Sequence, residues 1–533
     1  MQYKHFGIMI DCSGNGVLKV EKVKDLIDKM EKMGYNLLEL CTDDTYKIED
    51  EPYFGYLRGG YTKAEIQEMD EYAKAHGVEL VPCIQTLAHL TNLVKLPHYA
   101  DIVDIGNILM VDNPKTYQLI DKMFAALADM YTTRLVNIGM DEAHMLGLGK
   151  FLDRHGYQNR FDIFLRHLNK VVEIAKKHGF KPHIWSDMFF RLATGGAYYK
   201  EGVHIPEEVK QAVPKDVELC YWDYGEHELK EELFKDMFEA HQQFDREIWF
   251  AGGAWTWNGF APHNKFSLDV MKMALKQATE HNVENVMITI WAGDRNECSY
   301  FSVLPSLYAM KEYALGNFDD EAIAKGFEET FGLSYQSMMT LDIPNKTKLN
   351  PEVAKISSAC KTLLFNDCFL GWKDSAIETE WPIPYGEYAK KLAKAKASCE
   401  EYGYIFDTLE TLCKVLEIKG DLGLRTRKAY QAGDRATLRS LTDCYAETEL
   451  RVKAFYQAYK TQWKKECKPY GWEVHEIRLG GLRSRLLDCK ERIEEYLDGK
   501  ADSIPELEET ILPYADWKLQ YNSYRGLVTV SEL

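Results

Sequence analysis

Strand-like and helix-like segments alternate eight times along the first 315 residues, and this alternation limits the fold more than any other feature. The apolar, strand-like runs cover residues 6–11, 36–40, 78–84, 134–140, 182–188, 217–224, 248–257 and 286–291. Stretches with apolar residues at helical spacing lie between them, for example KVEKVKDLIDKMEKMG and HELKEELFKDMFEAHQQF. Strands that are apolar throughout and are each followed by a helix predict a parallel sheet that is buried on both faces.

Eight such units predict a (β/α)8 TIM barrel, for which about 250 residues or more is the normal size. An open, doubly wound sheet is the alternative. That fold usually carries a glycine-rich phosphate loop after its first strand, and the stretch DCSGNGV does not have the required spacing. The expected fold class is therefore α/β, with the barrel formed first along the chain.

The sequence changes character after about residue 340. Strand-like runs vanish, and long charged amphipathic stretches follow, among them EYAKKLAKAKASCEEYGYIFDTLETLCKVLEIKG. This pattern predicts an all-α domain of three or more antiparallel helices. We therefore expect a catalytic barrel over residues 1–335 and a C-terminal helical domain over residues 336–533.

Charge and cysteine usage narrow the class of partner. The chain has 83 acidic and 65 basic residues, and this balance argues against a nucleic-acid partner, which would favour a basic surface. The 12 cysteines show no CxxC pair and no zinc-ligand spacing, so they predict reduced thiols. The first residues are too few and too polar for a secretory signal, and no apolar run approaches 18 residues. We expect a cytoplasmic chain without a membrane partner, and a homodimer stays open.

The carboxyl ends of the predicted strands collect residues that can do chemistry. In a TIM barrel these ends form one face, and the active site lies there. Each residue alone would more often have a structural role, but together they predict an acidic pocket with aromatic walls, which suits a sugar ring. They are Asp11, Asp43, Asp44, Gln85, His89, Asp141, Glu142, Trp185, Asp187, Trp222, Asp223, Tyr224, Trp255, Trp257, Trp291, Asp294, Arg295 and Glu297.

Two adjacent acids, Asp141 and Glu142, follow the fourth predicted strand in the stretch NIGMDEAH. A solvated turn or a helix N-terminus, where acids are favourable, is the simpler interpretation. A catalytic pair is the other. Neighbours on a strand point to opposite faces, so the two carboxylates are expected at different depths and in different roles. Glycoside hydrolysis uses one acid to protonate the leaving oxygen and a second group to support the positively charged transition state.

Three stretches together resemble a known family: CTDDTYKIEDEPYFGYLRGGYTKAEI, GVELVPCIQTLAHL and NIGMDEAH. They are similar to glycoside hydrolase family 20, the β-N-acetylhexosaminidases, and most of all to its bacterial intracellular branch, in which a helical domain follows the barrel. The resemblance covers residues 1 to about 320 well and the helical tail loosely. It implies an exo-acting, retaining enzyme that removes terminal β-linked N-acetylglucosamine or N-acetylgalactosamine from oligosaccharides or glycoconjugate fragments, with no cofactor and no metal.

The resemblance also implies roles for single residues. In this family the substrate's own acetamido oxygen attacks the anomeric carbon and forms an oxazolinium ion. Asp141 would orient the acetamido N–H and stabilise the positive charge, and Glu142 would act as general acid and then as general base. Asp44 and His89 match an Asp-His pair behind the acid, with Asp43 as the alternative to Asp44. The expected substrate-binding residues are Trp185, Trp222 and Trp291 as walls of the acetamido pocket, with Tyr224, Trp257, Asp294, Arg295 and Glu297.

The sequence departs from the family pattern after strands 1 and 8. Relatives usually carry an arginine just after strand 1, where it bonds the 3- and 4-hydroxyls of the sugar, and this chain has Gly14 there. The loop after strand 8 introduces Arg295, whose planar guanidinium can serve vicinal hydroxyls. We hypothesise that Arg295 partly replaces the missing arginine. The alternative is that Arg295 lies on the surface and that Gly14 leaves a wider pocket.

Two other classes of protein stay open. A metal-dependent sugar-processing barrel could take its ligands from Asp44, His89, Asp141, Glu142, Asp187 and Glu297, although few histidines and many tryptophans argue against it. A non-catalytic barrel could bind an amino sugar without turning it over, although the retention of both acids argues against that.

Overall fold

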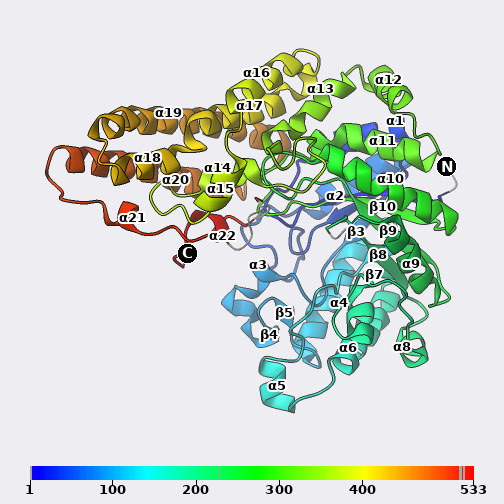
Figure 1. Ribbon diagram of the computed structural model, residues 1–533. Coiled ribbons are helices and arrows are strands. Elements are labelled where there is room, and N and C mark those ends of the chain that lie inside the picture. The colour runs from blue at the N-terminus through cyan, green and yellow to red at the C-terminus, as the bar shows by residue number, and fades with distance from the viewer. Residues whose placement is uncertain (1–2, 227–228, 515–518, 520–522, 533) are drawn as a thin grey trace. The chain divides into compact units, whose positions relative to one another are not determined.

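Eight parallel strands close into a barrel (Figure 1), in the order β1-β10-β9-β8-β7-β6-β3-β2. The computed structural model describes residues 3–226, 229–514, 519 and 523–532. The barrel strands are β1 His5–Asp11, β2 Leu37–Cys41, β3 Glu79–Cys83, β6 Leu135–Asn137, β7 Lys181–Trp185, β8 Glu218–Trp222, β9 Ile248–Gly253 and β10 Asn285–Ile290. A separate antiparallel pair consists of β4 Val103–Ile105 and β5 Ile108–Leu109.

The barrel closes because β1 pairs with both β10 and β2. Ile8 lies opposite Ile288 on one side and Leu38 on the other. All residues of β2, β9 and β10 are buried, which explains why these runs are mostly apolar. The helices that surround the strands in Figure 1 include α1 Val20–Met33, α2 Lys63–Ala75, α4 Pro114–Met130, α6 Arg160–Lys177, α9 Glu231–Gln242 and α10 Asn264–Glu280. Shorter elements of the same region are α3 Thr91–Val94, η1 Pro97–Ile102, α5 Lys150–His155, α7 Asp187–Thr194 and α8 Glu207–Ala212.

Local sequence signals set the ends of these helices. Thr62 caps α2, since its side chain accepts from the backbone N–H of Glu65 while the Glu65 carboxylate accepts from the backbone N–H of Thr62. Gly34 ends α1 in the left-handed conformation, at φ 77°. Such caps satisfy N–H and C=O groups that have no partner inside the helix, and each contributes on the order of 1 kcal/mol.

Polar and aromatic side chains fill the barrel near the beginnings of the strands. The indole ring of Trp249 lies between the rings of His5 and His183, with centroid distances of 5.1 Å and 4.6 Å. His183 bonds the Glu39 carboxylate at 2.7 Å, and neither side chain is exposed. The Trp249 indole N–H donates to Glu218 at 2.7 Å. This end of the barrel is therefore a packed and hydrogen-bonded floor.

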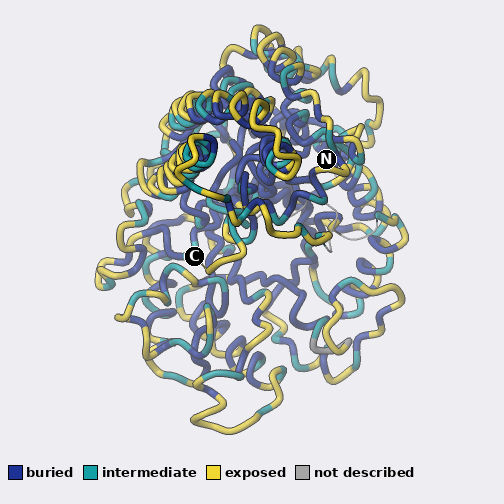
Figure 2. Tube along the Cα trace, turned by 60° about the vertical axis from the view of Figure 1, so that its left-hand side comes forward, coloured by how far each residue is buried: buried dark blue, intermediate teal, exposed yellow. Residues whose placement is uncertain are grey.

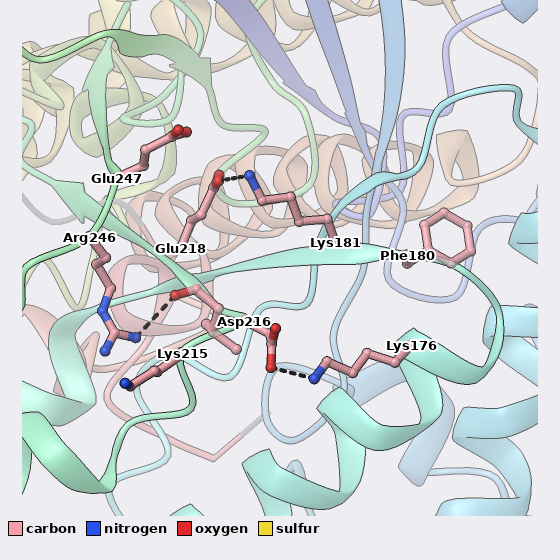
Figure 3. Close-up of a pocket in the computed structure, with 9 residues that line it drawn as sticks. Lys176, Phe180, Lys181, Lys215, Asp216, Glu218, Arg246 and Glu247 are labelled. Carbon is pink, nitrogen blue, oxygen red and sulfur yellow. Dashed lines mark hydrogen bonds and ion pairs between the residues drawn. The ribbon is translucent and has the colours of Figure 1, made fainter.

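A hollow of about 470 Å³ lies outside that floor, at the beginnings of β7, β8 and β9 (Figure 3). Two ion pairs join charges of its lining, Lys181 with Glu218 and Lys176 with Asp216. Arg246 donates to backbone carbonyls of the same wall. The residues that carry the expected chemistry follow the opposite, carboxyl ends of the strands.

The chain divides into two compact units. The first contains Met1–Gly253, Val270–Ile290 and Ala309–Phe318, and the second contains Ala254–Asp269, Trp291–Tyr308 and Asp319–Leu533. The expected boundary between residues 335 and 336 falls inside the short helix α13, Tyr335–Met339. The loops after β9 and β10 are thus grouped with the helical region, and their ion pairs below give the physical reason.

Helices dominate the second unit, where α16, α17, α19 and α20 pack in succession. Along α19 and α20 buried residues alternate with exposed ones, as expected of amphipathic helices (Figure 2). The (β/α)8 barrel and the helical C-terminal region that the sequence predicts are confirmed. Among the described helices, none has both the length and the apolar composition needed to cross a membrane. The remaining elements of the chain are η2 Tyr300–Val303, α11 Leu304–Ala314, α12 Asp320–Phe331, η3 Thr340–Asn345, α14 Ala359–Phe365, α15 Asp374–Glu380, α16 Tyr385–Lys396, η4 Glu400–Tyr402, α17 Gly403–Lys419, α18 Leu422–Gln431, α19 Arg435–Glu466, α20 Trp472–Leu497, α21 Pro505–Glu508 and α22 Arg525–Val528.

Candidate active site

The backbone that carries the acid pair leaves the extended conformation before it reaches the acids. Strand β6 ends at Asn137, three residues before the end of the predicted strand 134–140, and Gly139, Met140 and Glu142 have φ angles of 68°, 71° and 49°. A Cβ on Gly139 would lie 2.1 Å from the Gln85 Oε1 atom, so only glycine fits there. The alternation of a strand therefore does not apply to the two acids. Left-handed, non-glycine residues of this kind concentrate at functional sites.

Asp141 is held on both of its oxygens. The Gln85 side chain accepts from the Met140 backbone N–H at 3.1 Å and donates to Asp141 Oδ1 at 2.9 Å. His89 Nε2 lies 3.1 Å from Asp141 Oδ2. Burial acts to raise the pKa of Asp141, but the charge and hydrogen bond of His89 outweigh it and hold that pKa below its ordinary value. The charge of Asp141 in turn raises the pKa of His89 to about 10, so the two form an ion pair at neutral pH.

Glu142 has a different environment. Its side chain is 40% exposed, against 15% for Asp141. His89 Nε2 lies 3.7 Å from Glu142 Oε2, and Arg191 Nη2 lies 4.0 Å from Oε1. The Glu142 backbone N–H donates to Asp187 Oδ2 at 3.1 Å. The two acids thus differ in access and in partners, an arrangement that suits two separate roles.

In the loop after β2, the charge of Asp43 acts on His89, and Asp44 has a different partner. Burial and the charge of Asp11 raise the pKa of Asp43 to about 8, while the charge of His89 acts to lower it. Asp44 instead pairs with Arg58, whose Nε lies 3.3 Å from Asp44 Oδ1. Asp43 has φ 45°, and this turn separates the directions of the two neighbouring side chains.

Arg58 also reaches the loop after β1. Its guanidinium donates to the side chain of Asn15 and to the backbone carbonyl of Ser13, the two neighbours of Gly14. A cation therefore lies beside the position where the family pattern has its arginine. Sequence reasoning missed Arg58, because the one signal it offers is a charge opposite to that of Asp44, 14 residues earlier.

Aromatic residues after β7 and β8 lie together in the first unit. Trp222 and Tyr224 stack with ring centroids 5.4 Å apart, and Tyr198 packs on Trp222 at 5.0 Å. The Trp222 indole N–H is buried and has no hydrogen-bond partner in the described part of the chain. Trp185, the last residue of β7, is buried. An aromatic wall with an unused donor fits the expected sugar pocket.

The predicted residues after β9 and β10 are joined within the second unit. Trp257 stacks on Trp255 with centroids 4.0 Å apart. The Thr256 hydroxyl donates to the backbone carbonyl of Trp291 at 2.7 Å, which connects the two loops.

Asp294 and Glu297 have partners other than the expected substrate. Lys361 Nζ lies 2.8 Å from Asp294 and 2.7 Å from Glu297, and Arg478 contacts the same carboxylates at 2.8 Å and 3.0 Å. Lys361 is not exposed, and Glu297 is buried. Both carboxylates therefore form ion pairs with buried cations, which explains why this loop is grouped with the helical region. Between them, Arg295 has φ 77° and a half-buried side chain.

His89, Asp141 and Glu142 bring potential metal-ligand atoms within 4.8 Å of one another. Only a deprotonated imidazole nitrogen can bind a metal ion. In this structure the charge of Asp141 raises the pKa of His89 to about 10, so the two side chains form an ion pair with each other, and a metal ion would have to displace the His89 proton to bind.

Comparison with known proteins gives two family matches. Residues 3–239 match the model described as "Glycosyl hydrolase family 20, catalytic domain", and residues 336–524 match "Glycoside Hydrolase 20C C-terminal domain". Hexosaminidase D of Homo sapiens is 25% identical over 222 residues, which cover 39% of this chain and 42% of that protein. A Beta-hexosaminidase of Vibrio furnissii is 25% identical over 178 residues, which cover 26% and 29%.

Solved structures give a weaker likeness. The GH20 exo β-N-acetylglucosaminidase from Vibrio harveyi, in complex with N-acetylglucosamine, has a TM-score of 0.48 and 17% identity, and the match covers 64% of this chain and 58% of that one. The curated relatives are also matched over only part of their length, 42% for the Homo sapiens protein and 59% for Hexosaminidase D of Bos taurus.

Proposed function

The chain belongs to glycoside hydrolase family 20, and from that premise we propose that it is an exo-acting, retaining β-N-acetylhexosaminidase. Its substrate would be an oligosaccharide or glycoconjugate fragment that ends in β-linked N-acetylglucosamine or N-acetylgalactosamine. The arrangement of Asp141, Glu142 and His89 carries this proposal. One acid is an anion held on both oxygens, and the other is accessible and stands beside it.

Each acid serves a different atom of the same sugar in the proposed mechanism. The acetamido oxygen of the substrate attacks C1 while Glu142 gives its proton to the glycosidic oxygen, so the bond from C1 to the leaving group breaks and an oxazolinium ion forms. The Asp141 anion stabilises the positive charge near the C2 nitrogen. Water then attacks C1 and Glu142 takes a proton from it, so the bond from C1 to the acetamido oxygen breaks, the acetamido group is restored and the configuration at C1 is retained. Attack within one molecule gains from a high effective molarity.

The remaining residues have supporting roles in this proposal. Trp185, Trp222 and Trp291 are the proposed walls of the acetamido pocket, with Tyr224 and Trp257 as further sugar contacts. Asp43 takes over the place expected for Asp44 behind His89. We further propose the bacterial intracellular branch of the family, which the C-terminal 20C match supports only at the level of domain type.

A panel of nitrophenyl glycosides tests the function. We expect release of nitrophenol from the β-N-acetylglucosaminide or the β-N-acetylgalactosaminide, and nearly none from the matching β-glucoside and β-galactoside, which lack the acetamido nucleophile. A strong chelator is expected to leave the rate unchanged. Equal cleavage of glycosides without the acetamido group would contradict substrate assistance. Loss of activity with chelator would favour the metal-dependent class, and binding of N-acetylglucosamine without turnover would favour a binding protein.

Two arginine variants test how the terminal sugar is held. Because Arg58 lies beside Gly14, we expect Arg58→Met to raise KM for a plain hexosaminide about 10-fold or more, the loss expected for ~1.5–3 kcal/mol of charged hydrogen bonding. Arg58→Lys keeps a charge near Asp44 and controls for loss of loop support. Arg295→Met tests the sequence-based hypothesis in the same assay. A KM that rises only in Arg295→Met would restore that hypothesis, and unchanged KM in both variants would favour the wider pocket.

A further inference from the structure

A buried carboxylate, Asp187, touches the backbone of the proposed general acid. It is the first residue of α7 and is not exposed. Its Oδ2 accepts from the Glu142 backbone N–H at 3.1 Å and from Arg191 Nε at 3.2 Å. Its Oδ1 is buried and has no hydrogen-bond partner among the described residues. Leaving a buried carboxylate oxygen unpaired is costly, so this position calls for an explanation beyond packing.

Arg191 connects this carboxylate to the side chain of Glu142. One turn of α7 separates Arg191 from Asp187, which places the guanidinium over the carboxylate. Its Nη2 then lies 4.0 Å from Glu142 Oε1. The guanidinium also packs against the ring of Tyr198, 5.7 Å from the centroid, and donates to the Gly196 carbonyl at 3.4 Å. Its position is thus fixed from several sides.

We propose that Asp187 and Arg191 act as a positioning pair for Glu142: Asp187 fixes its backbone, and Arg191 sets the charge beside its carboxyl group. This inference rests on the proposed function, since it assumes that Glu142 is the acid. Neither residue would touch the sugar in this role. Both act through Glu142, whose left-handed backbone at φ 49° needs a partner that holds it.

The charges around Glu142 support the pairing. Glu142 faces His89 from the loop after β3, Asp141 beside it, and Asp187 and Arg191 from α7. Burial and the charge of Asp141 raise the pKa of Asp187 to about 7, while the Glu142 N–H and Arg191 act to lower it. A neutral or partly neutral Asp187 leaves more of the positive charge of Arg191 to act on Glu142, and an ionised Asp187 cancels it.

Four variants test the pair, with kcat and KM measured on a hexosaminide with an alkyl leaving group and on a nitrophenyl one. Asp187→Leu removes the bond to the Glu142 backbone, and we expect kcat for the alkyl glycoside to fall at least about 10-fold with KM changed little. Asp187→Asn keeps an acceptor for the N–H and removes the charge. Arg191→Gln removes the cation, and Arg191→Lys is expected to recover part of the lost rate.

The pH profile separates positioning from general support of the fold. The acid must carry a proton, so activity is lost on the alkaline side when that proton leaves. Above pH about 7, where Asp187 of the wild type is ionised, Asp187→Asn leaves Arg191 unopposed, which favours the ionised carboxylate and should move the alkaline limb to lower pH. Arg191→Gln should move it to higher pH, each by about half a unit to one unit for a partly exposed site. Arg425→Gln is the matched control, because Arg425 and Asp421 form a pair of the same spacing on α18 of the other unit.

The alkaline limbs of the pH profiles of Asp187→Asn and Arg191→Gln must move in opposite directions for the proposal to stand. Limbs that stay in place, or that move the same way, would overturn it even if kcat falls. If Asp187→Asn does not fold, Arg191→Gln decides alone, since an unmoved limb in that variant contradicts the proposal. A wild-type protein that releases no N-acetylhexosamine would refute the proposed function itself, and an active wild type with unmoved limbs would refute only this inference.

Discussion

Replacing Glu142 with glutamine is expected to lower kcat for hexosaminides with alkyl or sugar leaving groups by about 100-fold or more, the usual contribution of a general acid. Glutamine keeps the size of the side chain and its place between His89 and Arg191, but it has no proton to give. Nitrophenyl glycosides should lose much less in the first step, because their leaving group needs little protonation. The measurement is kcat and kcat/KM on a series of leaving groups of graded acidity.

The matched variant is Asp141→Asn. Asp141 is proposed to act on the acetamido group, so its loss should slow all leaving groups by a similar factor. It should also weaken the binding of a thiazoline mimic of the cyclic intermediate more than it weakens the binding of the substrate. Equal losses on alkyl and nitrophenyl glycosides in Glu142→Gln would count against the acid role.

Replacing Lys361 with methionine is expected to cost about 3–5 kcal/mol of unfolding free energy, the usual result of breaking a buried ion pair by removing one partner. Lys361 is not exposed and contacts both Asp294 and Glu297. Without it, Arg478 alone faces two carboxylates. Urea unfolding followed by far-UV circular dichroism measures the change. Lys396→Met, which removes an exposed pair with Asp407 in the same unit, is the control and should cost less than about 1 kcal/mol.

The loss should also depend on pH. Burial raises the pKa of Glu297 to about 7, and Lys361 acts to lower it, so removal of Lys361 raises that pKa further. A carboxyl group whose pKa is raised in the folded state still holds its proton there at pH values where the unfolded chain has already released it. Rising pH therefore favours the unfolded state, and stability falls between the unfolded and the folded pKa. Below pH about 7 Glu297 keeps its proton in the folded state of both proteins, so the cost of Lys361→Met should grow with pH only above about 7. Burial acts to raise the pKa of Asp294, but Lys361 and Arg478 hold it well below its usual range, so Asp294 stays ionised at these pH values. A cost that is small or independent of pH would contradict this account.

The fold was predictable because burial on both faces leaves a strong trace in composition. All eight barrel strands fall within or beside the apolar runs. The runs 134–140, 182–188 and 248–257 extend three or four residues past the ends of β6, β7 and β9, and the first of them is the most instructive. Ile138 and Met140 are as buried as strand residues, but the chain there is already a left-handed loop. An apolar sequence reports burial and not backbone angles, so the strand was predicted too long.

The sequence could predict a site residue only where its position relative to a neighbouring strand decides where its side chain lies. Asp141 and Glu142 lie in the loop after β6 and His89 in the loop after β3, and the barrel brings these loops together. The different surroundings of Asp43 and Asp44 depend on one backbone angle and on Arg58, which no local pattern reveals. Similarly, an acid at the end of a strand gives the same sequence pattern whether it faces a sugar or a buried lysine. The partners of Asp294 and Glu297 come from distant helices, so those two expectations could not be tested by sequence pattern alone.

The loops after β9 and β10 belong to the second unit, and this affects how the chain is synthesised and whether it can be truncated. Residues 254–269 and 291–308 belong to the unit that the last third of the chain completes. A ribosome that has just released the final barrel strand has not yet made Lys361 or Arg478, so these loops emerge before their partners exist. No single cut separates the two units, and a gene shortened at residue 335 would encode loops whose buried carboxylates have lost their cations. The segments of the two units therefore alternate along the chain, and truncation at residue 335 leaves the second unit incomplete.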